Sequence, residues 1–353
     1  MGFSKKKIGG EIPFIFDKKY NKAFNKNSFE NLNYFFSGRN AILEVIKNEE
    51  VKTLYVPKYY CYPVYDLLIS IKGLETYNYG SKDELLKKFS KNYKGEKSLI
   101  IILLFNGMRD SINKYLEIQQ IKNKNSISLI DAAMTPSIPK IDFDYDYLVT
   151  NPRKFYWLPL GTFLFSKKSA SIKFNLSFNF LNSIIYLSSK IVSRFLLSSR
   201  LDSLERVGLE INNYAENKVP ISLDLFSFLI IKNLKIKDLS AKRIKQYNIY
   251  FELLKPIKEF YFFKIMASSK DCPFGFILRI KERDELMRFL NSHRIFPSTL
   301  WQPPLVFNDE IGPETVTISK EILLLPIGDH YNSKDIKKVC KFVLKFFNDG
   351  KHL

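Results

Sequence analysis

From residue 37 to residue 168, short continuous apolar runs alternate with stretches in which apolar side chains recur at helical spacing. The runs predict buried strands, and the stretches between them predict helices packed against those strands. The predicted strands are 52–56, 75–79, 98–105, 127–130 and 147–150, and the predicted helices are 40–47 and 62–71. Because strands and helices that alternate in this way form parallel sheets with right-handed crossovers, we expect an α/β fold with a mostly parallel central sheet flanked by helices.

The C-terminal part of the chain predicts a smaller α+β domain. Helical stretches at 223–233 and 238–254 lead into it, and within it we predict strands at 274–280 and 322–326 and helices at 282–292 and 333–348. We therefore divide the chain into three parts, which are an N-terminal segment at 1–29, a large domain at 30–235 and a small domain at 236–353.

A long amphipathic stretch, 174–201, has Phe, Ile and Leu at helical spacing, and its polar side includes Lys190, Arg194 and Arg200. One interpretation is a helix in the core or at a dimer contact. The other is an interfacial helix whose basic side chains face anionic lipid. We favour the first interpretation, because apolar residues at this spacing are more often part of a core.

The composition is that of a folded globular protein, since 46% of the 353 residues are hydrophobic and 26% are charged. The net charge of +19 favours anionic partners such as nucleotide-linked molecules, but no recognised nucleic-acid-binding motif is present, so we expect no nucleic-acid partner. The 3 cysteines and 3 histidines indicate neither a disulfide framework nor a His-rich metal centre, and we expect no metal. Without an apolar leader or a bilayer-length apolar run, the chain is expected to be cytoplasmic.

Candidate chemistry begins with Ser37, Gly38, Arg39 and Asn40, which directly precede an apolar-periodic helix. A small-residue turn that opens a helix offers backbone N–H groups and the positive end of the helix dipole, and both suit a phosphate group. The simpler interpretation is an ordinary serine N-cap.

Asp131 ends the apolar run 127–130. A carboxylate at the end of a buried strand can hold a pyridine nitrogen in its protonated form, which makes a pyridine cofactor an electron sink. The alternative is an aspartate that only caps the following loop.

Lys154 follows the predicted strand 147–150, within the segment NPRKFYWLPLGTF. Its neighbours Arg153 and Phe155 disfavour the ammonium form by charge and by desolvation, which suits a lysine that binds a carbonyl cofactor covalently. The alternative is an Arg-Lys pair on the solvated surface.

Aromatic side chains follow the predicted strand 52–56, where the turn 57–61 contains Tyr59 and Tyr60. Their rings could stack on a planar cofactor, and together with the three preceding features they predict a pyridoxal phosphate site. Trp301 has two interpretations, one at the substrate entrance and one as buried packing.

The order of these motifs along the chain strengthens the prediction that each of them makes alone. The chain carries SGRNAI (37–42), VPKYYC (56–61), LIDAA (129–133), DYLVTNPRKFYWLPLGTFL (146–164), R-x-x-x-Y (243–247), STLWQPP (298–304) and LLLPIGDHY (323–331). In these motifs and their order, over about 30–348, it resembles the DegT/StrS-type sugar aminotransferases. The resemblance implies a fold-type-I aminotransferase that binds pyridoxal 5'-phosphate (PLP).

By this resemblance, Lys154 binds PLP covalently and Asp131 pairs with the pyridine nitrogen. Gly38, Arg39 and Asn151 lie around the phosphate, and the other expected cofactor-binding residues are Ser37, Asn40, Tyr60 and Met134.

Several positions depart from the family pattern. Met134 stands where the family usually has Gln or His, and Asn151 stands where it usually has Ser. Leu160 replaces an acidic residue, and Cys61 occupies a position that is often aromatic, which leaves Tyr60 or Tyr62 to stack on the ring.

The resemblance implies transfer of an amino group from an amino acid, glutamate, to a nucleotide-linked keto-sugar in polysaccharide or glycan synthesis. It also implies a homodimer, with 212–214 near the partner's site. Two alternatives remain open, a PLP enzyme with a different acceptor or reaction and a degenerate aminotransferase fold with a binding or scaffolding role.

Overall fold

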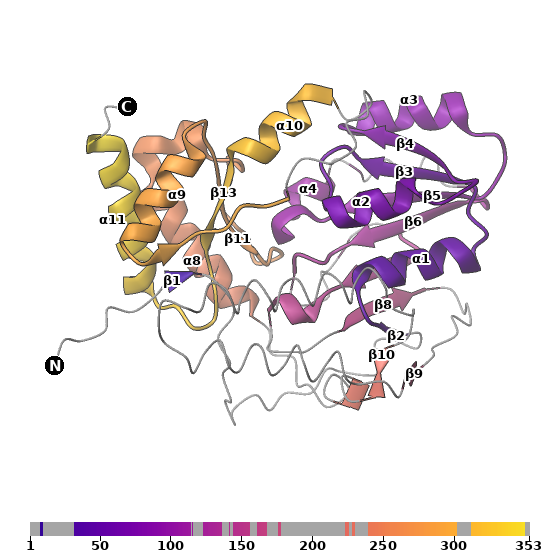
Figure 1. The fold of residues 1–353 in the computed structure, drawn as a ribbon, viewed down its shortest axis with the longest axis horizontal. Helices are drawn as coiled ribbons and strands as arrows, with labels where there is room; N and C mark the ends of the chain where they lie inside the picture. The colour runs from indigo at the N-terminus through magenta and orange to yellow at the C-terminus, as the bar shows by residue number, and fades with distance from the viewer. Residues whose placement is uncertain are drawn as a thin grey trace.

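The computed structural model describes residues 8–9, 32–113, 115, 123–135, 141, 144–155, 161–167, 176–177, 223–225, 228–229, 239–301 and 312–349. Two parts lie side by side, a sheet domain that contains α1 to α4 and a smaller domain that contains α8, α9 and α11 (Figure 1).

The central sheet of the large part has seven strands in the order β2-β8-β7-β6-β5-β3-β4. The strands are β2 Leu32–Phe35, β3 Thr53–Pro57, β4 Glu75–Tyr79, β5 Ser98–Leu103, β6 Ser126–Asp131, β7 Tyr147–Thr150 and β8 Thr162–Ser166. Pairing is parallel from β4 through β7, whereas β8 is antiparallel to both β7 and β2. The predicted mostly parallel sheet is confirmed.

Helices cover both faces of this sheet. They are α1 Gly38–Asn48, α2 Tyr62–Ile69, α3 Lys82–Asn92 and the short α4 Asp110–Asn113. Alternate strand residues enter two apolar clusters, so that Ile101 packs in the cluster that contains α1 and α2, and Ile102 packs in the cluster that contains α3. Burial of both faces explains why β5 is continuously apolar in sequence.

Four elements of this domain were not predicted, and the short helix α4 is one of them. The helix α3 begins after Ser81, whose hydroxyl accepts a hydrogen bond from the Glu84 N–H, and it buries Leu85 and Phe89. This spacing is a capping signal followed by an i, i+4 apolar pair. The strands β2 and β8 are the others, and β8 is antiparallel.

The predicted strand 98–105 is too long. β5 ends at Leu103, and the chain turns through a 3-10 segment, Phe105–Gly107, in which Asn106 has a positive φ of 58°. The apolar run continues beyond the strand because Phe105 packs against Phe262 and Phe263 of the small domain rather than within the sheet.

One helix prediction is wrong at the residues that the structure describes, and another is right only in part. Leu176–Ser177 (β9) and Leu223–Asp224 (β10) are strands paired in parallel, where 174–201 and 223–233 predicted helix. Within 223–233, the described residues 225, 228 and 229 are helical. Residues 178–222 lie outside the described residues, so the two interpretations of 174–201 remain predictions, and the position of 212–214 is one as well. No helix within the described ranges is long and apolar enough to span a membrane.

The small domain is α+β, as predicted. It comprises α8 Ser240–Leu253, the 3-10 segment Lys255–Phe260, β11 Gly275–Arg279, α9 Arg283–Ser292, β12 Ile295–Phe296, α10 Gly312–Glu321, β13 Ile322–Pro326 and α11 Ser333–Asp349. β11 and β13 pair antiparallel.

The N-terminal strand β1, Ile8–Gly9, pairs with β12 and therefore joins the small domain. The Gly9 N–H donates to the Tyr331 hydroxyl at 2.7 Å. A Cβ on Gly9 would lie 1.9 Å from the Phe296 carbonyl oxygen, and φ is 95°, so only glycine fits there.

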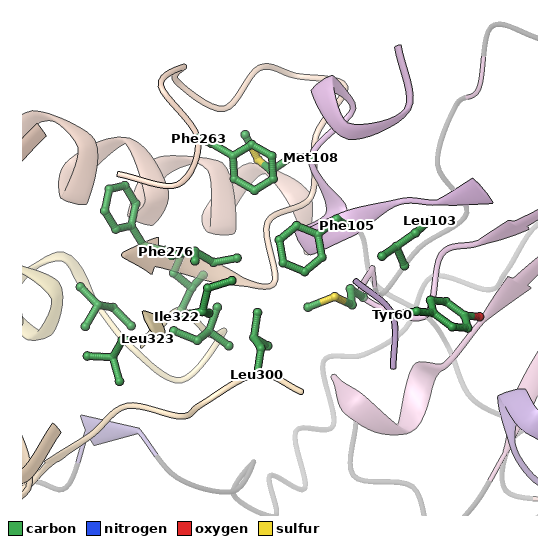
Figure 2. Close-up of a cluster of buried hydrophobic side chains, with 14 of the residues drawn as sticks. Tyr60, Leu103, Phe105, Met108, Phe263, Phe276, Leu300, Ile322 and Leu323 are labelled. Atoms are coloured by element: carbon green, nitrogen blue, oxygen red, sulfur yellow. The ribbon is translucent and has the colours of Figure 1, made fainter. Parts of the chain in front are cut away.

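One apolar core joins the two domains. Figure 2 shows Leu103 and Phe105 beside Phe263 and Leu300, with the cluster continuing to Phe276 in the small domain. Polar bonds add to this junction, because the Asn106 side chain donates to the Gly275 carbonyl and accepts from the Gly275 N–H, both at 3.0 Å. The carboxyl end of β5 is thus fixed to the small domain.

Candidate active site

The predicted site residues meet at the carboxyl ends of β6 and β7. Asp131 is the last residue of β6, and Lys154 lies in a 3-10 turn, Pro152–Lys154, that follows β7. The first turn of α1 is adjacent, since a Cβ built on Gly38 would lie 3.8 Å from Val149 Cγ1 of β7. Ligands of open α/β sheets bind at this kind of edge.

The N-terminus of α1 is capped by Ser37. The Ser37 hydroxyl accepts from the Asn40 N–H at 3.4 Å and donates to Asn40 Oδ1 at 2.8 Å. The serine N-cap interpretation is therefore confirmed. A phosphate role for this turn stays a prediction, and it is compatible with the cap because the first-turn N–H groups of a helix have no acceptor within the helix.

The Asp131 carboxylate is buried, with 6% of the residue exposed, and both of its oxygens accept hydrogen bonds. Oδ1 accepts from the Ala133 N–H at 2.9 Å, and Oδ2 accepts from the Tyr60 hydroxyl at 2.6 Å. Burial and the negative charge of Asp131 raise the pKa of Tyr60 well above its usual value, so the phenol remains a neutral donor. Each carboxylate oxygen has a second lone pair, which leaves capacity for another donor.

On the β7 side, Lys154 is half-buried, and its N–H donates to the Asn151 carbonyl at 3.2 Å. Asn151 is 5% exposed, and its Oδ1 has no hydrogen-bond partner among the residues that the structure describes. An unsatisfied polar atom at this depth is costly unless a ligand completes it. Half a rotation of the amide would present its NH₂ group instead, and that group can donate to a phosphate.

The pKa of the Cys61 thiol is affected by the charges of several of these groups. Burial raises the pKa of the thiol, the charge of Lys154 lowers it, Asp131 raises it and Arg39 lowers it. The thiol therefore lies within the electrostatic reach of all three predicted site residues. Sequence reasoning treated Cys61 only as the loss of an aromatic ring, and no local sequence signal indicates its central position.

Trp301 belongs to an aromatic cluster where the two domains meet. Its ring centroid lies 5.2 Å from that of Tyr59, 5.6 Å from that of Phe105 and 6.3 Å from that of Tyr60. These contacts are tilted packing contacts, which supports the packing interpretation of Trp301.

The remaining predicted positions give less information. Met134 is buried in the apolar core three residues after Asp131, and a contact with the cofactor ring stays a prediction. The Arg153 side chain, 156–160 and 212–214 lie outside what the structure describes. Within the described part, no group of three His, Cys, Asp or Glu side chains could hold a metal ion.

The residues present fit PLP. A carboxylate with remaining acceptor capacity suits the pyridine nitrogen, a half-buried lysine suits covalent attachment, and the α1 N-terminus with the unsatisfied Asn151 amide suits the phosphate. The mostly parallel sheet with a small C-terminal domain is the fold of the fold-type-I PLP enzymes, and this donor set is compatible with their cofactor.

Comparisons with known proteins agree with this class. Residues 227–344 match the model of the DegT/DnrJ/EryC1/StrS aminotransferase family. No curated protein sequence matches the chain.

Solved structures share the fold. A DegT DnrJ EryC1 StrS aminotransferase from Brucella abortus has a TM-score of 0.59 and 16% identity, with 90% of this chain and 86% of that chain covered. DesV from S. venezuelae, solved with a ketimine intermediate, has a TM-score of 0.60 and 14% identity over 93% of this chain and 86% of its own. DesI, solved in the presence of its TDP-sugar product, has a TM-score of 0.56 and 11% identity over 92% of this chain and 82% of its own.

At these identities the likeness establishes the fold, and the match to the family model covers 227–344 alone. The chain therefore has the fold of these aminotransferases, as the order of its motifs predicted.

Proposed function

We propose that this protein transfers the amino group of an amino acid, glutamate, to a nucleotide-linked keto-sugar in polysaccharide or glycan synthesis. The observation that carries the proposal is the meeting of Asp131 and Lys154, with Arg39, around the Cys61 thiol at the carboxyl ends of β6 and β7. The reaction needs a carboxylate for the pyridine nitrogen and an amine for proton transfer in one place.

Each residue has a distinct task in this proposal. The α1 N-terminus, with Gly38, Arg39 and Asn151, binds the phosphate, and the Asp131 carboxylate binds the ring nitrogen. Lys154 holds the cofactor covalently and, once released from it, uses Nζ to take the proton from the α-carbon of the amino-acid donor. When bound, PLP supplies an electron sink that stabilises the negative charge left at that carbon.

The acceptor is the least constrained part of the proposal. The net charge of +19 favours an anionic substrate such as a nucleoside diphosphate, and DesI, which shares the fold, was solved with a TDP-sugar product. We also propose a homodimer, the usual assembly of enzymes with this fold.

The test uses the complete chain incubated with PLP. We expect an absorbance band in the near-visible range, and borohydride reduction followed by peptide mass spectrometry should place the cofactor on Lys154. Glutamate should then remove the band, and a nucleotide-linked keto-sugar should restore it.

Each stage has a contrary outcome. Failure to bind PLP would overturn the proposal and favour a binding or scaffolding role. Binding without a response to any of several amino acids would retain the cofactor site and point to a different reaction, with Met134 beside the ring as the first position to examine.

A further inference from the structure

We propose that Tyr60 is a positioning residue that holds the Asp131 carboxylate correctly oriented for the ring nitrogen of the cofactor. This role differs from stacking on the ring, which is what the sequence predicted for Tyr60. The inference rests on the proposed PLP site.

The Tyr60–Asp131 bond joins separate parts of the sheet. Tyr60 follows β3 and Asp131 ends β6, with β5 lying between these two strands in the sheet. The hydroxyl and Asp131 Oδ2 are 2.6 Å apart, and Tyr60 is 4% exposed. Figure 2 shows the Tyr60 ring at the edge of the apolar cluster with its hydroxyl directed away from that cluster. Packing therefore fixes the position of the Tyr60 ring, and with it the position of the hydroxyl that donates to Asp131.

A neutral donor affects a carboxylate in two ways. It stabilises the ionised form, because a hydrogen bond to a charged acceptor is stronger than one to a neutral acceptor. It also fixes the plane of the carboxylate, since the Ala133 N–H holds the other oxygen at 2.9 Å. With both oxygens held, the remaining lone pairs have defined directions for the ring nitrogen.

Other charged groups surround the same carboxylate and have to be kept constant in a test. Those that share the electrostatic surroundings of the neighbouring Cys61 thiol are Arg39 from α1 and Lys154 from the turn after β7. Neither residue changes when only the Tyr60 hydroxyl is removed. The difference between the unsubstituted protein and a Tyr60→Phe variant therefore isolates that one donor.

The chain contains a matched control. The Tyr147 hydroxyl donates to Glu49 Oε1 at 2.5 Å, and both residues are buried in the same domain. Tyr147→Phe thus removes the same kind of bond, from a tyrosine to a buried carboxylate. Glu49 follows the C-terminal end of α1, whereas the predicted phosphate site lies at its N-terminal end, so this pair is not part of the cofactor site.

The experiment measures the dissociation constant of PLP from pH 5 to pH 8 for the full-length protein, Tyr60→Phe and Tyr147→Phe, together with the thermal unfolding of each apo form. In Tyr60→Phe, the carboxylate loses one of the two donors that fix it, so its pairing with the ring nitrogen weakens. We expect the Kd at pH 5 to increase about tenfold, because a hydrogen bond to a charged acceptor is a strong one.

Tyr147→Phe should keep the pH profile of the unsubstituted protein, although it loses a comparable amount of stability. The titrations of free PLP are common to all variants and cancel in the comparison. A second test uses the Asp131→Asn background, in which Tyr60→Phe should produce no further increase in the Kd because the carboxylate that Tyr60 holds is gone.

The outcomes separate this inference from the proposed function. Equal profiles for Tyr60→Phe and Tyr147→Phe would overturn the positioning role and leave the PLP site standing. Failure of the unsubstituted protein to bind PLP would remove both. If Tyr60→Phe does not fold, Tyr60→Met supplies a second side chain without a hydroxyl that can fill the same space, and the same increase in the Kd is expected.

Discussion

The two sides of the candidate site differ in how far the protein itself satisfies them. At the end of β6, both oxygens of Asp131 accept hydrogen bonds from Tyr60 and Ala133. After β7, the Asn151 side-chain oxygen is buried without a partner among the described residues, and Lys154 is half-buried. On one side each oxygen already accepts a hydrogen bond from the protein, whereas the other side retains a polar atom that accepts none from the described residues.

This difference indicates that the two sides of the site have different tasks. Groups that have to hold a charge in a fixed place benefit from a rigid, satisfied environment. Groups that attach a ligand, release it and move protons require freedom and a partner that comes and goes. The asymmetry therefore predicts different consequences for stability and for function when each side is changed.

The largest expected effect is on the Lys154 side. Lys154→Ala should abolish borohydride-stable attachment of PLP and lower the rate of amino transfer by about 10²–10⁴-fold, because the proton-transferring amine is absent. The thermal midpoint of the apo protein should hardly change, since no described contact of the Lys154 amine stabilises the fold. Steady-state kinetics, mass spectrometry and thermal unfolding measure the three quantities. A full rate in this variant would show that another group moves the proton.

The second expected effect is on the stability of the apo protein, compared between one substitution on each side of the site. Asp131→Asn replaces an acceptor of two hydrogen bonds with an amide that cannot accept both at once, and we expect it to destabilise the apo protein by about 1–3 kcal/mol. Asn151→Ala removes an oxygen that accepts no hydrogen bond within the described part of the chain, and we expect its effect on stability to stay within about 1 kcal/mol. Urea unfolding of the two apo proteins gives both values.

PLP affinity should fall in both of these variants, because each loses a group that the proposed site uses. The variants thus differ in apo stability but agree in loss of binding. Equal destabilisation by Asn151→Ala and Asp131→Asn would contradict the described asymmetry. Unchanged PLP affinity in Asn151→Ala would remove Asn151 from the phosphate site.

The positions of Asp131 and Lys154 could be predicted from sequence because each follows an apolar run that becomes a central parallel strand. The period of the apolar residues identifies such strands, and parallel strands bring their carboxyl ends to one edge. Ser37 was equally accessible, since a cap is a local feature. The helix α3 also had a local signal at Ser81 and Glu84.

The remaining features depend on contacts between distant parts of the chain. The bond from Tyr60 to Asp131 joins residues 71 positions apart, and nothing near either residue specifies it. Phe105 extends an apolar run because it packs on the small domain, and hydrophobicity does not reveal which partner a residue will have. The convergence of charges on Cys61 is of the same kind.

The smallest expected effect is on the labelling rate of Cys61, which tests whether the two sides of the site lie close together. Cys61 is partly exposed, whereas Cys272 and Cys340 are buried, so a maleimide should label Cys61 first. Burial raises the pKa of the Cys61 thiol, and the positive charge of Lys154 opposes that effect. Lys154→Met removes the charge, so the pKa rises further, the thiolate fraction at pH 8 falls, and the labelling rate should decrease about threefold.

Lys167→Met is the control for this measurement, because Lys167 is also on the sheet domain but forms an exposed ion pair with Asp144. It should leave the labelling rate unchanged, and Cys61→Ala should abolish the fast-labelled peptide. PLP should protect Cys61 in the unsubstituted protein, since the proposed cofactor site lies among Arg39, Asp131 and Lys154. A labelling rate that responds neither to Lys154→Met nor to PLP would place Cys61 outside the site. It would also show that the Asp131 side and the Lys154 side do not meet around this thiol.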